Sequence, residues 1–486
     1  MIAFVAVVFI VIDLIHFYLW KRLVKDPLRP GRLRHAGAVV AVLLAVLVPV
    51  TLIGVRSGYL VWLAWPGYLW LALMFYLLVT LAALEIPRLV INLWMRAASR
   101  RAGDVERVKA GAAETVRSVT AQRERVGAAE LERVGATEPE TAGAAKLANA
   151  GAQAEGVAAE LERVGAAELE RVGAAERENA AAIAATMVHA GVADPATLLD
   201  PALDAQLGPD AQAGINRRLL LARGVAIFAG LTAAGVTGYG VKTALGPPQL
   251  DRVQLPLAKL PRAMDGTRLA VVSDIHLGPL TGTQHAARIV GLINSVNADI
   301  VCIVGDLVDG SVAELGRFAA PLAGIRSRRG AFFVTGNHEY YSGYQEWVTE
   351  VARLGVRPLR NERLEIDGLD LAGVNDLGGV DFGDGPDLQR ALGDRDARRP
   401  VVLMAHQPAV ARDAAPFGVD LQVSGHTHGG QMAPFNLLVK LEQPVVSGLG
   451  KVDGVPVYVT NGAGFWGPPV RVGAPPQVTV IELRTP

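Results

Sequence analysis

The chain has 486 residues, with 47 Lys and Arg against 47 Asp and Glu, and a single Cys. One Cys excludes a scaffold held by internal disulfides, and a formal charge of zero argues against binding nucleic acid by overall electrostatics. Hydrophobic residues make up 51% of the chain and charged residues 19%, so we expect membrane segments, and the length predicts two or three structural units.

Residues 1–97 contain three strongly apolar runs, at about 1–20, 36–55 and 59–84. Each has about the 20 residues that a helix needs to cross ~30 Å of hydrocarbon, so this region is predicted to hold three transmembrane helices. Asp13 and His16 lie three residues apart in the first run. Ionisable groups inside a membrane are candidates for function, but we favour a structural role in contact with headgroups or a neighbouring helix.

Residues 98–216 are built from Ala, Glu, Arg, Val and Gly, and an eight-residue unit recurs, as in LERVGAAE at 161–168 and 169–176. A period of eight does not match 3.6 residues per turn, so the apolar residues form no single stripe on a helix. The Gly in each unit weakens a helix further. The segment is predicted to be a partly helical or disordered linker, with an oligomerising coiled coil as the alternative.

At residues 217–245, Arg217 and Arg218 precede a Gly-rich apolar stretch that Arg223 interrupts. This pattern predicts a fourth transmembrane helix or a signal-anchor of twin-arginine type. Positive residues are concentrated at 21–35 and on either side of the linker, and such residues mark the cytoplasmic side. We therefore expect a multi-pass protein of the cell membrane, with the domain after residue 245 outside the cytoplasm if 219–241 crosses.

Residues 246–486 have the composition of a globular domain with alternating strands and helices. The helical patterns include 284–295 and 344–354, and the strand-like runs are largely continuous and apolar, as expected of strands covered on both faces. An α/β domain is therefore predicted. The expected strands are 269–273, 300–304, 331–335, 369–374, 401–405, 421–424, 457–460 and 478–483.

Polar motifs follow five of these strands directly. Because open α/β sheets bind ligands at the carboxyl ends of their strands, the five loops are expected to converge on one site. Residues two apart in extended chain point the same way, so both members of a pair such as His426 and His428 can reach that site. The motifs are Asp274-Ile275-His276, Gly305-Asp306, Gly336-Asn337-His338-Glu339, His406 and Gly425-His426-Thr427-His428.

Carboxylate, amide and imidazole donors of this kind suit Mn²⁺, Fe or Zn²⁺ rather than a thiolate site. One ion does not need so many ligands, so the set points to two divalent metal ions. The ordered motifs DIH, GD, GNHE, H and GHTH resemble the calcineurin-like metallophosphoesterase superfamily. The runs GHTHGGQ at 425–431 and TNGAGFWGPPVRVG at 460–473 resemble its membrane-associated bacterial branch.

The resemblance implies a four-layered α/β sandwich with two central β-sheets flanked by helices. It also implies a metal-dependent phosphoesterase in which a metal-bridging hydroxide attacks phosphorus and His338 acts as the general acid. Asp306 is implied to be the shared ligand between the two ions. The first ion is implied to be held by Asp274, His276, Asp306 and His428, and the second by Asp306, Asn337, His406 and His426.

Membrane anchoring favours a phosphoester, phosphodiester or pyrophosphate substrate that is lipid-linked or located in the envelope, and no nucleic acid is expected as a partner. Two alternatives stay open. One is a membrane receptor or scaffold that retains the fold, and the other is an enzyme that faces the cytoplasm and hydrolyses nucleotides. The sequence indicates neither the oligomeric state nor the natural substrate.

Other polar and aromatic residues of the domain receive more modest interpretations. Asp309 either supports a metal ligand or is a solvated loop carboxylate. His285 is expected on a helix as a surface or packing residue, and Cys302 as a buried core thiol. Packing is the default for Phe465 and Trp466, with the substrate cleft or the membrane surface as alternatives.

Overall fold

The computed structural model describes residues 2–87, 89–90, 111, 114, 117, 118, 121 and 209–486. Two compact units form, one from Met1–Ile86 with Arg217–Pro486 and the other from Pro87–Asn216. The predicted linker at 98–216 lies outside the described residues apart from the isolated positions above and 209–216. Its predicted conformation therefore stays a prediction.

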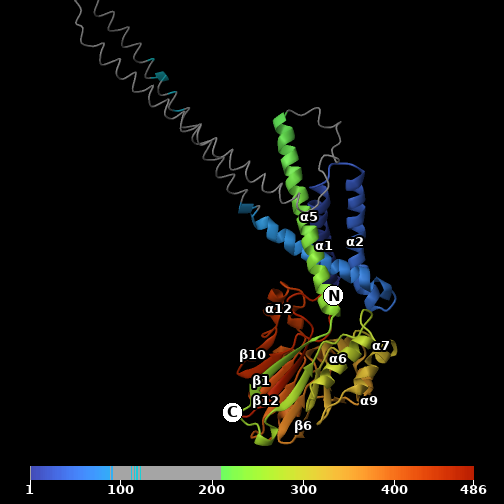
Figure 1. The fold of residues 1–486 in the computed structure, drawn as a ribbon, viewed down its shortest axis with the longest axis vertical. Coiled ribbons are helices and arrows are strands. Elements are labelled where there is room, and N and C mark those ends of the chain that lie inside the picture. The colour runs from blue at the N-terminus through green and yellow to red at the C-terminus, as the bar shows by residue number, and fades with distance from the viewer. Residues whose placement is uncertain are drawn as a thin grey trace, which may run out of the picture. The chain divides into compact units, whose positions relative to one another are not determined.

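Helices occupy all four apolar segments that the sequence singles out (Figure 1). They are α1 (Ile2–Trp20), α2 (Arg32–Arg56), the helix Val61–Pro87 and α5 (Pro209–Leu245), with a π-helical turn at Lys21–Lys25 after α1. Within the part of the chain that the structure describes, three helical stretches are long and apolar enough to cross a membrane, namely Arg32–Arg56, Val61–Pro87 and Leu219–Leu245. Helix α5 begins eight residues earlier than the expected segment at 217–245.

The globular domain contains two six-stranded mixed sheets. In the first, the order is β1-β12-β2-β3-β4-β5, and β2 to β5 are parallel. In the second, the order is β10-β11-β9-β8-β7-β6, and β11, β9, β8 and β7 are parallel. The strands are β1 (Gln249–Pro256), β2 (Thr267–Val272), β3 (Ile300–Val304), β4 (Ala331–Val334), β5 (Arg357–Pro358), β6 (Glu362–Ile366), β7 (Leu369–Gly373), β8 (Val401–Met404), β9 (Leu421–Ser424), β10 (Gly448–Val452), β11 (Val455–Val459) and β12 (Gln477–Arg484).

Three apolar clusters separate the layers. Side chains from both sheets, such as Val271, Cys302 and Val423, form the central cluster. The other face of the first sheet packs against helices, and the other face of the second sheet does the same. These helices are α6 (Thr283–Ser295), α7 (Val312–Ala319) and α9 (Tyr344–Arg353) for the first sheet, and α10 (Leu388–Leu392) and α11 (Ala411–Ala414) for the second.

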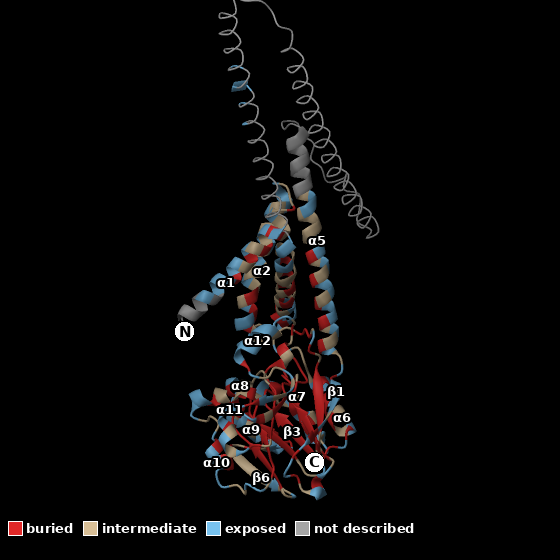
Figure 2. Ribbon diagram, turned by 90° about the vertical axis from the view of Figure 1, so that its left-hand side faces the viewer, coloured by how far each residue is buried: buried red, intermediate tan, exposed pale blue. Residues whose placement is uncertain are grey.

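The predicted four-layered sandwich is therefore confirmed, with burial concentrated in the strands (Figure 2). All eight expected strands are present within one or two residues of the predicted ends, and β3 and β9 have the predicted bounds. The sequence did not predict β1, β5, β6 and β10, because these strands carry more exposed or polar residues. Cys302 is buried in β3, and His285 is buried on α6, as expected of a packing residue.

Candidate metal centre

The carboxyl ends of five parallel strands carry the predicted ligands. Strands β2, β3 and β4 are neighbours in the first sheet, and β8 and β9 are neighbours in the second. The short helix α8 (Asn337–Tyr341) begins three residues after β4. The structure brings together every predicted ligand and the predicted general acid: Asp274, His276, Asp306, Asn337, His338, His406, His426 and His428.

One group of donor atoms forms around Asp274. His276 Nε2 lies 3.0 Å from His428 Nε2, and His428 Nε2 lies 3.4 Å from Asp274 Oδ1. Asp306 Oδ2 approaches the same group, 3.8 Å from His276 Nε2. These four residues are the set predicted for the first ion.

A second group forms on the other side of Asp306. His406 Nε2 lies 3.2 Å from Asp306 Oδ2 and 3.3 Å from His426 Nδ1, and His426 Nδ1 lies 3.0 Å from Asn337 Oδ1. Asp306 is therefore the one residue common to both groups, as the resemblance implies for a ligand shared by two ions.

The donor set fits two divalent cations. Ligand atoms at about 2.0–2.2 Å from a metal ion lie roughly 3–3.5 Å from one another. Most of the distances given above are 3.0–3.4 Å, and the distance from Asp306 Oδ2 to His276 Nε2 is 3.8 Å. Asp274 and Asp306 are almost fully buried, and burial of carboxylates is costly unless cations neutralise them. All donors are oxygen or nitrogen atoms, the class that Mn²⁺, Fe and Zn²⁺ accept.

Two of the imidazoles, those of His426 and His428, have a protonation state that allows metal binding. Burial, followed by the charge of His406, lowers the pKa of His426 to about 3. Burial and the nearby Arg471 hold the pKa of His428 well below its usual range. Both rings are therefore neutral at ordinary pH and offer a lone pair to a cation.

The backbone of the ligand loops is held in an unusual conformation. Five of the predicted ligands have positive φ, with values from 46° to 71°. Non-glycine residues seldom adopt this region, and they persist there only when the surrounding structure enforces it. Gly336 must be glycine, because a Cβ would collide with the backbone nitrogen and the carboxylate of Asp306. The five ligands are Asp274, His276, Asp306, His426 and His428.

Glu339 joins the loop after β3 to the loop after β4. Its buried carboxylate accepts hydrogen bonds from the backbone N–H groups of Asp306 at 3.0 Å, Leu307 at 2.7 Å and Gly336 at 2.6 Å. Burial, followed by the charge of Asp306, raises the pKa of Glu339 to about 7. The sequence reading placed Glu339 in the motif without giving it this role.

His338 lies beside the donor groups and is oriented by Asp309. Asp309 Oδ1 is 2.7 Å from His338 Nδ1 and 2.8 Å from His276 Nδ1, so Asp309 supports a ligand and is not a free loop carboxylate. Burial alone would lower the pKa of His338, but Asp306 and then Asp309 raise it to about 9. In this structure the imidazole of His338 is therefore protonated near neutral pH.

Arg471 also supports the centre, and this role was not predicted from the sequence. It is fully buried and donates to the His428 carbonyl at 2.7 Å, to Asn461 O at 2.9 Å and to Gly464 O at 2.9 Å, while Nη2 lies 3.0 Å from His428 Nδ1. Burial lowers the pKa of Arg471 to about 9. The signal was available, since Arg471 belongs to the run at 460–473 quoted above.

Four other residues that the sequence singled out lie outside the donor groups. His16 is buried and hydrogen-bonded, with Nδ1 2.8 Å from Ile12 O and Nε2 accepting from Trp70 Nε1 at 3.1 Å, so it has the contact with a neighbouring helix that the structural interpretation expects. Asp13 is exposed along a groove between α1 and α2. Phe465 is packed as expected, whereas Trp466 is 58% exposed and its ring centroid lies 6.0 Å from that of His338.

Sequence comparisons agree with the geometry of the centre. The family profile for calcineurin-like phosphoesterases matches residues 267–430. A "transmembrane protein with metallophosphoesterase domain" from Danio rerio is 37% identical over 272 residues, which cover 53% of this chain and 62% of the relative. An uncharacterized metallophosphoesterase from Helicobacter pylori is 36% identical over 258 residues, covering 52% of this chain and 68% of the relative.

The similarity covers only part of this chain and of its relatives. The chain spans about three fifths of the length of the vertebrate relatives, 62% for Danio rerio and 59% for Bos taurus. Among solved structures, a dimetal phosphatase from Danio rerio aligns with 45% of this chain and 93% of its own, at 10% identity and a TM-score of 0.29.

The contacts of Arg471 predict that Arg471→Met weakens metal binding. Methionine leaves the His428 carbonyl and ring without their donor, and loss of such supporting contacts costs about 10- to 100-fold in metal affinity. Calorimetric titration of the metal-stripped full chain with Mn²⁺ measures the effect. Arg484→Met is the matched control, because Arg484 pairs with Asp265 at the surface. Equal Kd values for the two variants would contradict the role of Arg471.

Proposed function

This chain belongs to the calcineurin-like phosphoesterase family, and we propose that it is a membrane-anchored phosphohydrolase that uses two divalent cations. The observation that carries the proposal is the position of Asp306, which contributes to both donor groups. Two cations bound there would activate a water molecule and neutralise charge on the phosphoryl oxygens in the transition state.

Different residues would bind the two cations and donate the proton. Asp274, His276 and His428 would hold one cation with Asp306, and Asn337, His406 and His426 would hold the other. His338 would donate its proton to the departing oxygen, and Asp309 would keep the imidazole in position through the 2.7 Å contact at Nδ1. The proposed substrate is a phosphoester, phosphodiester or pyrophosphate.

We also propose that the chain crosses the membrane several times, with the metal centre outside the cytoplasm. Helix α2 ends at Arg56, whose guanidinium lies over the ring of Tyr341 in the α/β domain, 5.0 Å from its centroid. Helix α5 ends at Leu245 and leads directly into β1. Both helix ends therefore adjoin the same domain, which supports placing them on one side of the membrane. The positive residues at 21–35 favour the cytoplasm for the opposite side.

Removal of His338 should separate proton transfer from metal binding. We expect His338→Ala to lower kcat by about 10²- to 10⁴-fold, because general acid catalysis is lost while both donor groups remain. The assay is Mn²⁺-dependent hydrolysis of bis(p-nitrophenyl) phosphate by the full chain in detergent, with metal content measured in parallel. Loss of metal from His338→Ala would refute the role assigned to it.

The same assay separates an enzyme from a receptor or scaffold that retains the fold. We expect Asp306→Ala to abolish hydrolysis, since both donor groups lose their shared member. If the wild-type chain binds metal but hydrolyses no mono-, di- or pyrophosphate ester, the receptor interpretation replaces the enzyme.

The membrane topology predicts that reporters fused after Leu84 and after Leu245 lie on opposite sides of the membrane. One helix, α5, separates the linker from the α/β domain, so a single crossing must change the side. Alkaline phosphatase and green fluorescent protein fusions measure sidedness. The same side for both fusions would contradict the proposal and favour a domain that faces the cytoplasm.

A further inference from the structure

The rim of the metal centre is built partly from the membrane helices. Two exposed aromatic rings flank His338, with centroid distances of 5.8 Å for Tyr341 and 6.0 Å for Trp466. Arg56, at the last position of α2, lies over the ring of Tyr341, 5.0 Å from its centroid. Tyr341 is therefore close both to a cation of the membrane helices and to the proposed general acid.

Arg56 is placed to bind an anion. Its side chain is exposed, and in the described part of the chain it forms no ion pair. Its guanidinium donors are suited to phosphate oxygens, which arginine binds in a bidentate manner. At the end of a membrane helix it would lie at headgroup level, where a phosphoryl group carried by a lipid is found.

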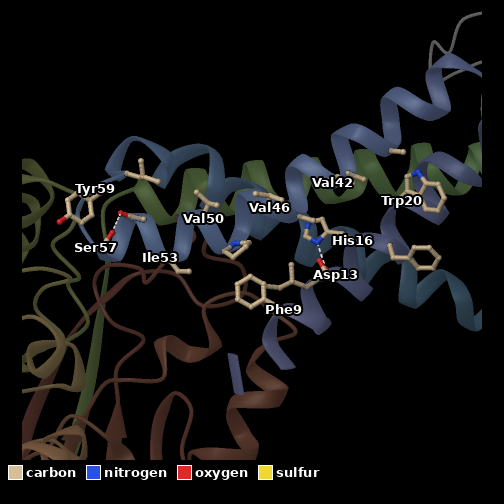
Figure 3. Close-up of a pocket in the computed structure, with 18 residues that line it drawn as sticks. Phe9, Asp13, His16, Trp20, Val42, Val46, Val50, Ile53, Ser57 and Tyr59 are labelled. Atoms are coloured by element: carbon tan, nitrogen blue, oxygen red, sulfur yellow. Dashed lines mark hydrogen bonds between the residues drawn. The ribbon is translucent and has the colours of Figure 1, made fainter. Parts of the chain in front are cut away.

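An apolar groove lies between the membrane helices, and one of its ends is next to Arg56 in the sequence. It lies between α1 and α2, has a volume of about 840 Å³, and its walls are formed mainly by apolar side chains. Figure 3 shows these side chains in a row along the two helices, from Trp20 at one end to Ser57 and Tyr59 at the other. Ser57 follows Arg56 directly in the chain, so the groove ends beside the exposed cation.

The size and charges of the groove fit an amphiphile in one orientation. Its volume is within the range of about 300–1,000 Å³ that is typical of ligand sites. Asp13, partway along the wall, would repel an anionic headgroup, whereas Arg56 at the end nearest the metal centre would attract one. A lipid with an anionic phosphoryl head would therefore lie with its acyl chain along α2 and its head toward His338.

From these observations we infer that the substrate is a phosphorylated lipid, whose acyl chain occupies the α1–α2 groove and whose phosphoryl group contacts Arg56. This inference rests on the proposed function, because it names the substrate class for the same centre. It assigns Arg56 and the groove to substrate recognition and leaves the chemistry to the residues of the α/β domain.

The test is photo-crosslinking with a phosphatidic acid that carries a photoactivatable acyl chain. The full chain is reconstituted in nanodiscs of phosphatidylcholine, and labelled peptides are mapped by mass spectrometry. We expect label on α1 and α2, removed by excess unlabelled phosphatidic acid. Label spread evenly over the membrane helices, or resistant to that competitor, would mean unspecific contact with bulk lipid and would overturn the inference.

Two variants and their matched controls sharpen this test. Val46→Trp fills the groove and should reduce labelling to background, whereas Leu43→Trp adds the same bulk to α2 away from the groove lining and should not. Arg56→Ala should reduce labelling about tenfold, the effect of losing a charged hydrogen bond, whereas Lys242→Ala removes a basic residue from the last turn of α5 without effect. Arg56→Ala changes an exposed residue, so it also covers the case in which Val46→Trp fails to fold.

The crosslinking result does not depend on catalysis. If the wild-type chain is labelled in the groove but hydrolyses no phosphoester, the proposed function fails and the lipid site stands. If the chain hydrolyses bis(p-nitrophenyl) phosphate while Val46→Trp and Arg56→Ala are labelled as strongly as wild type, the enzyme stands and the lipid inference fails.

Discussion

Asp306 imposes the main constraint on the α/β domain. Its carboxylate is almost completely buried, and it faces His276 and His406, which belong to two separate donor groups. Asp274, a second carboxylate, is buried close by, and burial together with Asp306 raises the pKa of Asp274. Such a concentration of buried acceptors is unfavourable by itself, and two cations are the simplest way to compensate it. Strand ends from both sheets must meet near Asp306, namely those of β2, β3 and β4 in the first sheet and of β8 and β9 in the second. Asp306 therefore constrains how the two sheets are arranged.

The loops that carry the ligands need support from residues that do not touch the proposed ions. Glu339 joins the loops after β3 and β4, Asp309 orients His276 and His338, and Arg471 holds His428. Arg471 is also connected to helix α5, because its backbone N–H donates to Gly240 O at 3.0 Å. A Cβ at Gly240 would collide with Val470, so this close approach requires glycine. Support of the metal centre therefore extends into a candidate transmembrane helix.

Much of the domain could be predicted because its signals are local. Continuous apolar runs marked the parallel strands, and each motif begins one or two positions after its strand, so the convergence of the motifs followed from the strand ends alone. The strands β1, β5, β6 and β10 lack that signal, because they are more exposed or only two residues long. Strand β1 pairs with the distant strand β12, whereas β6 and β10 pair with the strands that follow them in the chain, β7 and β11.

The contacts of Arg471 and Arg56 could not be predicted, because each joins residues that lie far apart in the sequence. The run at 460–473 marked the segment that contains Arg471 but not its partner. Arg471 contacts His428, which lies 43 positions away in the sequence, and Arg56 contacts Tyr341 from a separate helical region.

Metal stoichiometry tests the central claim most directly, measured by plasma mass spectrometry on the full chain after loading with Mn²⁺. The account predicts two ions per chain in the wild type, one in Asn337→Ala, and fewer than one in Asp306→Ala. One ion per wild-type chain, or equal content in the two variants, would contradict a centre in which two cations share Asp306.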